Sequence, residues 1–308
     1  MKEPIISVSG LRGIVGESID PILAIKYCCA YVGGLKTDGP IVVTRDGRAT
    51  GSMLAHAVCS GLSAIGREVI YGDVAATPTT GILVREHRAA GGIQISASHN
   101  PAPYNGIKLF ESSGRVIPAD SGLKVIEAYR NFEFKTVSHE CVGVISNLED
   151  TTSAHLKAVL ETVDVERIRA QKYSVVLDSH HGAGSVLGRE LLVALGCQFT
   201  CLGGTPDGLF TRSPEPTEVN LRETTAKAVD LKAQVVFCQD PDADRLALID
   251  EQGIFNYLDS PPKTLTAKDH RPPYGTDGDY FSKPSVDEII ESVYRIMNES
   301  NPKKYPIL

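Results

Sequence analysis

Long apolar segments are missing from this chain of 308 residues. No apolar run approaches the roughly 20 residues that a helix needs to cross a bilayer. The first ten residues, MKEPIISVSG, also lack the hydrophobic region of a signal peptide. Basic residues are fewer than acidic ones, and the net charge of −7 argues against a general nucleic-acid-binding protein. These absences predict a soluble, cytoplasmic protein without a membrane or nucleic-acid partner.

Cysteine pairs with Cys-x-x-Cys spacing are also absent. The seven cysteines are odd in number, so neither a disulfide framework nor a zinc finger is indicated. Hydrophobic residues, in contrast, make up 42% of the chain and charged residues 22%, a composition that can bury a sizeable core. At roughly 100–200 residues per domain, the length allows two domains, or two domains and a remnant.

Strand-like runs alternate with helical runs in two series, which predicts the α/β class. The polar segment 130–150 separates the series, so we expect domains over residues 1–145 and 146–253. Strands are expected at 40–46, 68–72, 92–96, 105–112, 173–178, 198–202, 234–238 and 246–249, and helices at 20–32, 52–65, 79–88, 118–129, 152–163, from 184 onward and at 219–231. Residues 261–308 hold 7 of the 18 prolines, and the tail 254–308 is expected to be irregular apart from one helix at 285–297.

The segment DPDADR at residues 240–245 follows the expected strand QVVFC directly. Its three carboxylates, Asp240, Asp242 and Asp244, alternate along the chain and can converge on one hard cation such as Mg²⁺ or Mn²⁺. A calcium EF-hand is excluded because its sixth position needs glycine for a sharp turn, and Arg245 stands there. The alternative is an acidic turn exposed to solvent.

The segment SASHNP at residues 96–101 places a serine at the carboxyl end of an expected strand. Ser98 and His99 are adjacent and point apart, so they form a poor hydrolase pair. The chain also has no Gly-x-Ser-x-Gly elbow. A serine near a metal loop suits a residue that carries phosphate, and the alternative is a polar turn closed by Asn-Pro.

Basic side chains recur in the segments SGLRG, TRDGRATG and NGIKLF, at Arg12, Arg45, Arg48 and Lys108. Arginine recognises phosphate through two parallel hydrogen bonds, and lysine offers a point charge or a transferable proton. Each alone reads as a surface charge, but together with the serine and acidic loops they indicate a cleft that handles phosphate. The pair at residues 180–181, His-His, has no third metal ligand at a suitable spacing and predicts a turn before a helix.

Taken together, these motifs resemble the α-D-phosphohexomutases, which include phosphoglucomutase, phosphomannomutase and phosphoglucosamine mutase. The matching motifs are SGLRG at 9–13, RDGR at 45–48, SASHNP at 96–101, NGIK at 105–108, PDGLFTRSPEPTEVNL at 206–221 and DPDADR at 240–245. The resemblance covers residues 4–253. It implies two consecutive family-type α/β domains with mixed sheets, the first with the phosphoserine loop and the second with the metal loop.

The resemblance also implies an activity and a set of roles. The family transfers a phosphoryl group between C1 and C6 of a hexose or hexosamine phosphate, through a phosphoserine and a sugar bisphosphate. Ser98 would be the phosphoserine and would hold Mg²⁺ together with Asp240, Asp242 and Asp244, while Lys108 would be the general acid/base. By the same resemblance the further catalytic residues are His99 and Arg12, and the phosphate-binding residues are Ser9, Arg45 and Arg245.

Family members continue with a third and a fourth domain that carry a GExSGH-like sugar loop and an RxSGTEP-like phosphate loop. Neither motif occurs in residues 254–308, so the resemblance predicts a C-terminally truncated member. A catalytically inactive fragment or regulatory phosphate- and metal-binding module is one alternative, and a phosphosugar phosphatase is another. A sheet edge or apolar face exposed by truncation is expected to favour self-association. Within the family, the sequences SVSGLRG and ISASHNP resemble bacterial phosphoglucosamine mutase or phosphomannomutase more than the long eukaryotic phosphoglucomutases.

Overall fold

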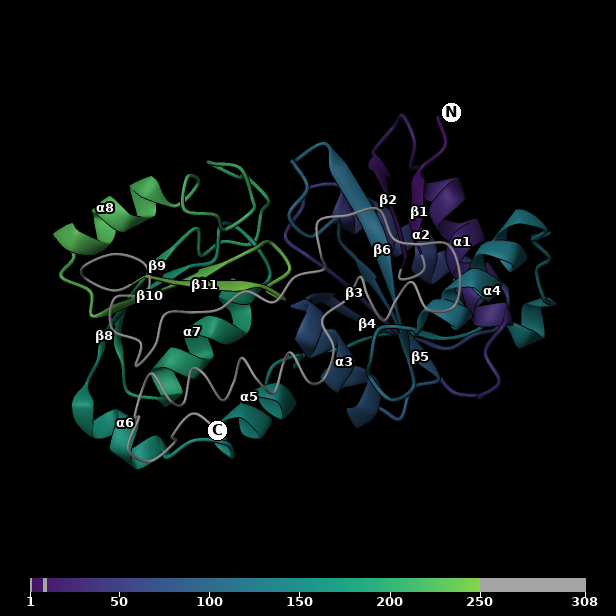
Figure 1. The fold of residues 1–308 in the computed structure, drawn as a ribbon. Coiled ribbons are helices and arrows are strands. Elements are labelled where there is room, and N and C mark those ends of the chain that lie inside the picture. Colours follow the sequence, from purple (N-terminus) through teal and green to yellow (C-terminus); the bar gives the residue numbers. More distant parts are fainter. Residues whose placement is uncertain (1, 8–9, 250–308) are drawn as a thin grey trace, which may run out of the picture. The chain divides into compact units, whose positions relative to one another are not determined.

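The computed structural model describes residues 2–7 and 10–249. Residues 1–248 form one compact unit, and a second unit begins at residue 249. The helix expected at 285–297 and the predicted site residue Ser9 lie outside the described residues. The compact unit contains two sheets, each with helices packed against it (Figure 1), so the predicted α/β fold with two successive α/β domains is confirmed.

The first domain has a seven-stranded mixed sheet in the order β1-β2-β6-β5-β3-β4-β7. Strand β3 pairs in parallel with β4 and β5, whereas β6 pairs antiparallel with β5 and β2. The strands are β1 (Ile5–Ser7), β2 (Gly10–Ile14), β3 (Ile41–Arg45), β4 (Val69–Val74), β5 (Gly91–Ile95), β6 (Tyr104–Glu111) and β7 (Ile145–Asn147), and the helices are α1 (Pro21–Gly33), α2 (Gly51–Ala64), α3 (Thr77–Glu86) and α4 (Ala119–Arg130).

The core of the first domain lies on both faces of this sheet. Along β3, Ile41 and Val43 join the buried cluster that includes residues of α1 and α2, whereas Val42 joins a cluster with Leu83 and Val84 of α3. Successive side chains of a strand point to opposite faces, so one strand feeds both clusters. A central strand buried on two sides has the continuous apolar sequence expected of parallel sheets covered by helices.

The second domain has a four-stranded sheet in the order β11-β10-β8-β9, in which β8 pairs in parallel with β9 and β10. Figure 1 shows α7 and α8 on opposite sides of it. Val175 and Leu177 of β8 pack against Leu192 of α7. The strands are β8 (Ser174–Asp178), β9 (Gln198–Leu202), β10 (Val235–Gln239) and β11 (Leu246–Ile249), and the helices are α5 (Ser153–Leu160), α6 (Val165–Gln171), α7 (Gly184–Ala194) and α8 (Arg222–Asp230).

The polar segment 130–150, which we expected to separate the domains, contains strand β7, which extends the first sheet by pairing with β4. The expected domain boundary after residue 145 therefore falls inside a strand of the first domain. All three residues of β7 are exposed, so no burial pattern in the sequence marks it. The strand expected at 246–249 is present as β11.

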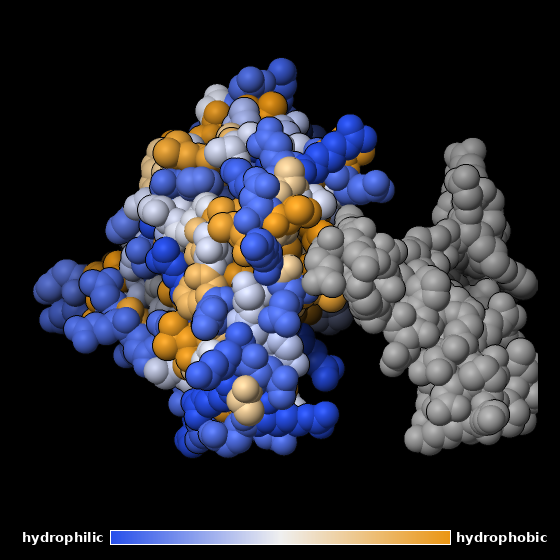
Figure 2. Space-filling view, turned by 90° about the vertical axis from the view of Figure 1, so that its left-hand side faces the viewer, coloured by the Kyte–Doolittle hydropathy of each residue, from blue (hydrophilic) through white to orange (hydrophobic). Residues whose placement is uncertain are grey.

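Apolar side chains are not confined to the interior. Figure 2 shows apolar residues gathered between polar ones on the face that it presents. In the second domain the exposed apolar side chains include Val193 of α7, Val229 of α8 and Leu246 of β11. Within the described residues no helix combines the length and apolarity that a membrane crossing requires. Self-association stays a prediction.

Candidate active site

The serine loop follows strand β5. Ser98 is 3% exposed, and its main chain adopts a left-handed conformation with φ of 52°. The Ser98 amide donates to Ser96 Oγ at 2.9 Å, and Ser96 Oγ donates in turn to Asp46 Oδ2 at 2.8 Å. Asp46 is fully buried at the end of β3. The loop is therefore fixed by groups of the neighbouring strand, and the Ser98 side chain is turned to the acidic loop.

The acidic loop follows strand β10 and brings three carboxylates together. One oxygen from each of Asp240, Asp242 and Asp244 lies within 4.8 Å of the others. Asp240 and Asp242 are fully buried, whereas Asp244 is partly open to solvent. Burial, followed by the charges of Asp242 and Asp244, raises the pKa of Asp240 to about 7. Repulsion between carboxylates is relieved when a cation stands among them.

The serine and acidic loops meet directly, although 142 residues separate Ser98 from Asp240 in the sequence. Ser98 Oγ donates to Asp240 Oδ2 at 3.0 Å. Arg245 Nη2 lies 2.9 Å from Ser98 Oγ and 3.1 Å from Asp240 Oδ2. A serine hydroxyl thus stands between a carboxylate and a guanidinium, which is a suitable place for a phosphoryl group.

Lys108 joins the acidic loop from strand β6. Its Nζ donates to Asp242 Oδ2 at 2.5 Å and to Asp244 Oδ2 at 2.6 Å. Burial works to lower the pKa of Lys108, but the two carboxylates outweigh it and the pKa lies above its ordinary value. Asp242 shows the complementary effect: burial opposes ionisation, yet the neighbouring ammonium lowers its pKa. Lys108 is therefore protonated in this arrangement.

His99 and Arg12 complete the surroundings of Ser98. His99 Nδ1 contacts Arg245 Nη2. Partial burial, followed by the charge of Arg245, lowers the pKa of His99, which favours the neutral ring as a hydrogen-bond acceptor. Within residues 2–7 and 10–249, the guanidinium of Arg12, a residue of β2, makes no hydrogen bond or ion pair; Arg12 lines a cavity of about 210 Å³ together with Lys108 and Asp244. An unpaired guanidinium beside this cavity is available to an anion.

Two other predicted phosphate-binding arginines have partners elsewhere. Arg45 Nε donates to Asp73 Oδ1 at 2.6 Å, and Arg45 Nη1 donates to the Asp46 carbonyl at 3.1 Å. Arg48, which the sequence grouped with the phosphate cleft, is buried with its guanidinium turned to main-chain carbonyls of the serine loop. A buried guanidinium whose donors are all used has none left for a ligand phosphate.

Sequence reasoning missed two residues that hold the acidic loop. Thr77, the first residue of α3, donates through Oγ1 to Asp242 Oδ2 at 2.6 Å, and its amide donates to the Asp242 carbonyl at 2.8 Å. Gln94 Oε1 of β5 lies 2.5 Å from Thr77 Oγ1 and shares its single proton with Asp242 Oδ2, while Gln94 Nε2 donates to the Ala75 carbonyl at 2.9 Å. Neither residue lies in a motif. Gln94 stands between apolar residues in the strand sequence GGIQI, and a polar side chain at such a position could have indicated a buried polar network.

The donor set fits a divalent cation. Asp242 Oδ1 is buried and has no hydrogen-bond partner among the residues that the structure describes. A buried carboxylate oxygen is costly without a partner, and a hard cation with oxygen ligands supplies one. The residues able to hold the ion are Asp240, Asp242 and Asp244, with Ser98 Oγ beside Asp240.

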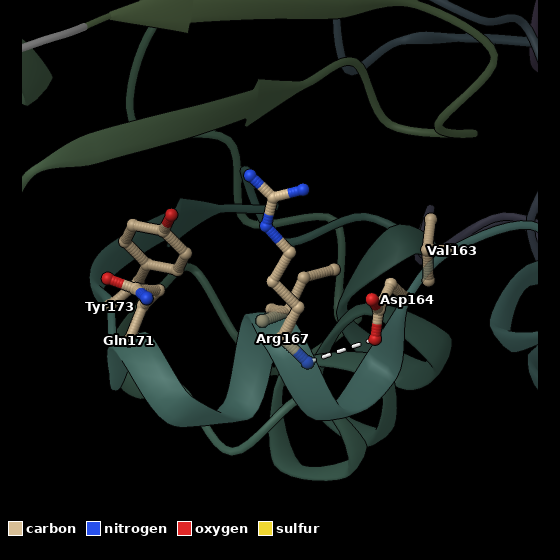
Figure 3. Close-up of a pocket in the computed structure, with 6 residues that line it drawn as sticks. Val163, Asp164, Arg167, Gln171 and Tyr173 are labelled. Atoms are coloured by element: carbon tan, nitrogen blue, oxygen red, sulfur yellow. Dashed lines mark hydrogen bonds between the residues drawn. The ribbon is translucent and has the colours of Figure 1, made fainter.

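A second cavity, of about 580 Å³, lies beside α6 and is larger than the cavity lined by Arg12. Its lining residues lie between 163 and 173, outside the serine and acidic loops. Figure 3 shows the Arg167 guanidinium extending away from the helix, while its amide donates to Asp164 Oδ1 at 3.0 Å. The lining residues are Val163, Asp164, Arg167, Ile168, Gln171 and Tyr173. None of them is a predicted site residue, so the candidate site remains at the serine and acidic loops.

Comparison with known proteins covers both domains. The family model for phosphoglucomutase/phosphomannomutase alpha/beta/alpha domain I matches residues 4–136, and the model for domain II matches residues 153–253. A phosphoglucomutase/phosphomannomutase of Thermococcus kodakarensis is 38% identical over 251 residues, which are 80% of this chain and 55% of that protein. A phosphoglucosamine/phosphogalactosamine mutase of Sulfurisphaera tokodaii is 35% identical over 79% of this chain and 54% of its own length.

Solved structures give the same picture. A phosphoglucomutase/phosphomannomutase family protein from Burkholderia thailandensis superposes with a TM-score of 0.67 at 27% identity, covering 83% of this chain and 57% of that one. The chain thus spans about half the length of the curated relatives it matches.

Proposed function

This chain belongs to the phosphoglucomutase/phosphomannomutase family, and we propose that its Ser98 carries the phosphoryl group exchanged with a hexose or hexosamine phosphate. The observation that carries the proposal is the contact of Ser98 Oγ with Asp240 Oδ2 at 3.0 Å and with Arg245 Nη2 at 2.9 Å. It brings the phosphate-accepting hydroxyl to the group of carboxylates suited to a cation.

The transfer replaces one phosphorus–oxygen bond by another. A sugar hydroxyl oxygen bonds to phosphorus while the bond between phosphorus and Ser98 Oγ breaks. Lys108 gives a proton to Ser98 Oγ and takes up the proton that the sugar hydroxyl loses, so it ends in the state in which it began. The reverse sequence returns the other phosphate of the sugar bisphosphate to Ser98. Each half-reaction is thereby balanced in protons and phosphoryl groups.

The remaining residues bind and orient. In this proposal Arg245 and Arg12 hold phosphoryl oxygens and His99 is oriented by Arg245, roles supported by the contact of Arg245 with His99 and by the position of Arg12 at the cavity. Ser9 and Arg45 are proposed to assist in phosphate binding. Mg²⁺ held by Asp240, Asp242 and Asp244 together with the Ser98 phosphoryl oxygens would offset the negative charge of the transferring group. The substrates, the completeness of the cycle in this chain and the cytoplasmic location stay predictions.

The decisive test is a two-stage assay on the purified chain with Mg²⁺. Glucose 1,6-bisphosphate is added first, and intact mass followed by peptide mapping should find one phosphoryl group on Ser98. Ser98→Ala should remain unmodified and Asp240→Asn should be modified far more slowly. An unmodified wild-type chain would overturn the proposal.

The second stage supplies glucose, mannose and glucosamine phosphates in turn and measures isomerisation against the Ser98→Ala blank. Ser98-dependent isomerisation would identify the sugar and show a complete cycle. Phosphoryl acceptance without isomerisation would restrict this chain to the first half-reaction. Release of inorganic phosphate faster than from Ser98→Ala would indicate a phosphatase instead.

A further inference from the structure

The guanidinium of Arg48 uses all five of its N–H groups inside the protein. Nη2 donates to the carbonyls of Ser98 at 2.7 Å and Asn100 at 2.6 Å, and Nη1 donates to those of Pro101 at 2.8 Å and Tyr104 at 3.0 Å. Nε donates to Asp46 Oδ2 at 3.1 Å, which balances the buried charge. Arginine has five donors in a planar fork, and no other side chain can bind these four carbonyls at once.

The loop that Arg48 binds needs such support. Ser98 has a φ of 52°, in the left-handed region that residues other than glycine rarely adopt. A residue keeps such a conformation only when the groups around it fix it. The carbonyl of Ser98 itself is one of the four acceptors, so Arg48 acts on the same residue that carries the reacting hydroxyl.

Arg48 also contacts the second domain. Its Cζ lies 5.0 Å from the centre of the Phe210 ring, and the His180 ring stacks on Phe210 at 5.0 Å with an angle of 17° between the planes. The main chain beside Arg48 also lies close to the main chain of the second domain at His181. A Cβ added to Gly47 would lie 2.4 Å from the His181 carbonyl oxygen, so only glycine fits there.

We propose that Arg48 is a positioning residue that fixes the Ser98 loop in its reactive conformation. Through its contact with Phe210, Arg48 also couples that conformation to the packing of the second domain against the first. The inference rests on the proposed phosphoryl transfer. The second domain contributes Asp240 and Arg245 to the site, so a link between the domains and the loop keeps the hydroxyl aligned with both. Arg48 itself touches no substrate.

The test compares Arg48→Lys with Val58→Ala. Lysine keeps the charge but loses the fork, whereas Val58 is a fully buried core residue of α2 whose apolar side chain makes none of the hydrogen bonds to the loop carbonyls. Both variants should lower the melting temperature. Only Arg48→Lys should slow Ser98 phosphorylation by glucose 1,6-bisphosphate, by about 10- to 100-fold at saturation, with the bisphosphate concentration at half-maximal rate unchanged.

A second variant guards against a general folding defect. Phe210→Leu keeps an apolar side chain but removes the aromatic face, and should slow Ser98 phosphorylation about 3- to 10-fold. Hydrogen exchange provides a readout without any sugar: Arg48→Lys should accelerate exchange at the amides of residues 97–105, and Val58→Ala should not.

The outcomes separate this inference from the proposed function. A wild-type chain that accepts no phosphate contradicts the proposed function, and unchanged exchange of the loop amides in Arg48→Lys then contradicts the positioning role as well. A wild-type chain that accepts phosphate at a rate shared by Arg48→Lys leaves the function intact and overturns the inference. Equal slowing by Arg48→Lys and Val58→Ala would reduce Arg48 to a stabilising residue and overturn it too.

Discussion

The two sheets of the compact unit bury their strands to different extents. In the first sheet, Ile41, Val42 and Val43 of β3 are all fully buried, and every residue of β5 is buried. In the second sheet, β9 has no buried residue and β10 alternates between buried and half-buried positions. The central strands of the first domain that support the serine loop are therefore almost fully buried, whereas strands β9 and β10 of the second domain are buried to a smaller extent.

The acidic loop nevertheless contains two of the most deeply buried carboxylates, Asp240 and Asp242. Part of their surroundings comes from the first domain, because Thr77 and Lys108 contact Asp242 and Ser98 contacts Asp240. The comparison teaches that the better-packed first domain helps to hold the acidic loop, in addition to the contacts that the second domain itself provides.

The largest effect should come from the first core. Ile93→Ala removes a fully buried side chain of β5 and should lower the free energy of unfolding by about 2–5 kcal/mol. Leu192→Ala in the smaller cluster of the second domain should fall at the lower end of that range, since its surroundings are half-exposed and can relax. Urea unfolding measures both losses, and equal losses would contradict the difference in packing.

A pH-dependent loss should arise in the second domain. Burial, followed by the charge of Arg212, lowers the pKa of His180 from 6.5 to about 4. The unfolded chain then binds the proton more readily than the folded one, so stability falls as the pH drops from 6.5 towards 4. The loss amounts to roughly 3 kcal/mol.

His180→Asn should flatten this part of the stability profile, because asparagine tolerates the left-handed conformation at φ of 47° and does not titrate. His139→Asn, which alters a histidine with a 92% exposed side chain, is the matched control. Thermal unfolding between pH 4 and 7 measures the difference. A His180→Asn profile parallel to that of wild type would show that His180 is not responsible.

The variant Thr77→Val tests whether the first domain supports the acidic loop. The variant leaves Asp242 Oδ2 and Gln94 without a shared hydroxyl, and should cost about 1–3 kcal/mol. It should also weaken Mg²⁺ binding about tenfold, the effect typical of losing a group that orients a metal ligand. Titration calorimetry with Mg²⁺ measures the affinity.

Thr80→Val on the same helix is the control, since the buried Thr80 hydroxyl contacts Thr44 rather than the acidic loop. It should lose stability while keeping the affinity of the wild-type chain for Mg²⁺. Equal affinities in the two variants would show that the first domain does not support the acidic loop.

The smallest effect is expected at the junction of the domains. Asp150 Oδ1 accepts from the amides of Thr152 and Ser153 at the start of α5. The Ser153 hydroxyl, followed by these two amides, lowers the pKa of Asp150 to about 2. Asp150→Ala should cost about 1 kcal/mol, as losses of helix caps do. Asp150→Asn, which keeps an acceptor, should cost less, and the two urea midpoints should differ accordingly.

The elements that the sequence predicted well are those with a local signal. Helix α1 begins at Pro21 after Asp20, whose carboxylate accepts from the Leu23 amide at 2.7 Å, as its capping sequence predicts. Strand β9 lies at 198–202 as expected. Strands β1, β2 and β7 and helix α6 were not expected. Strands β1 and β7 and helix α6 are three to seven residues long and mostly exposed. Strand β2 is largely buried, but its glycine-rich sequence predicts a loop that carries Arg12.

The candidate site shows the same division. Asp240 and Ser98 stand in short motifs whose spacing and residue types indicate their chemistry. Arg48 stands in a motif too, but its sequence does not distinguish an arginine that binds a ligand from one that binds the main chain. Thr77 has no signal at all, because its importance depends on a contact with Asp242, 165 residues away.

The docking of Asp242 on Thr77 also bears on the order of events during protein synthesis. Domains generally fold as units from the N-terminus as the chain leaves the ribosome. Thr77 and Lys108 belong to the first domain, which is synthesised before the acidic loop. When Asp242 leaves the ribosome, these two contacting residues are therefore already folded. The first domain can therefore serve as a template on which the last strands of the compact unit assemble.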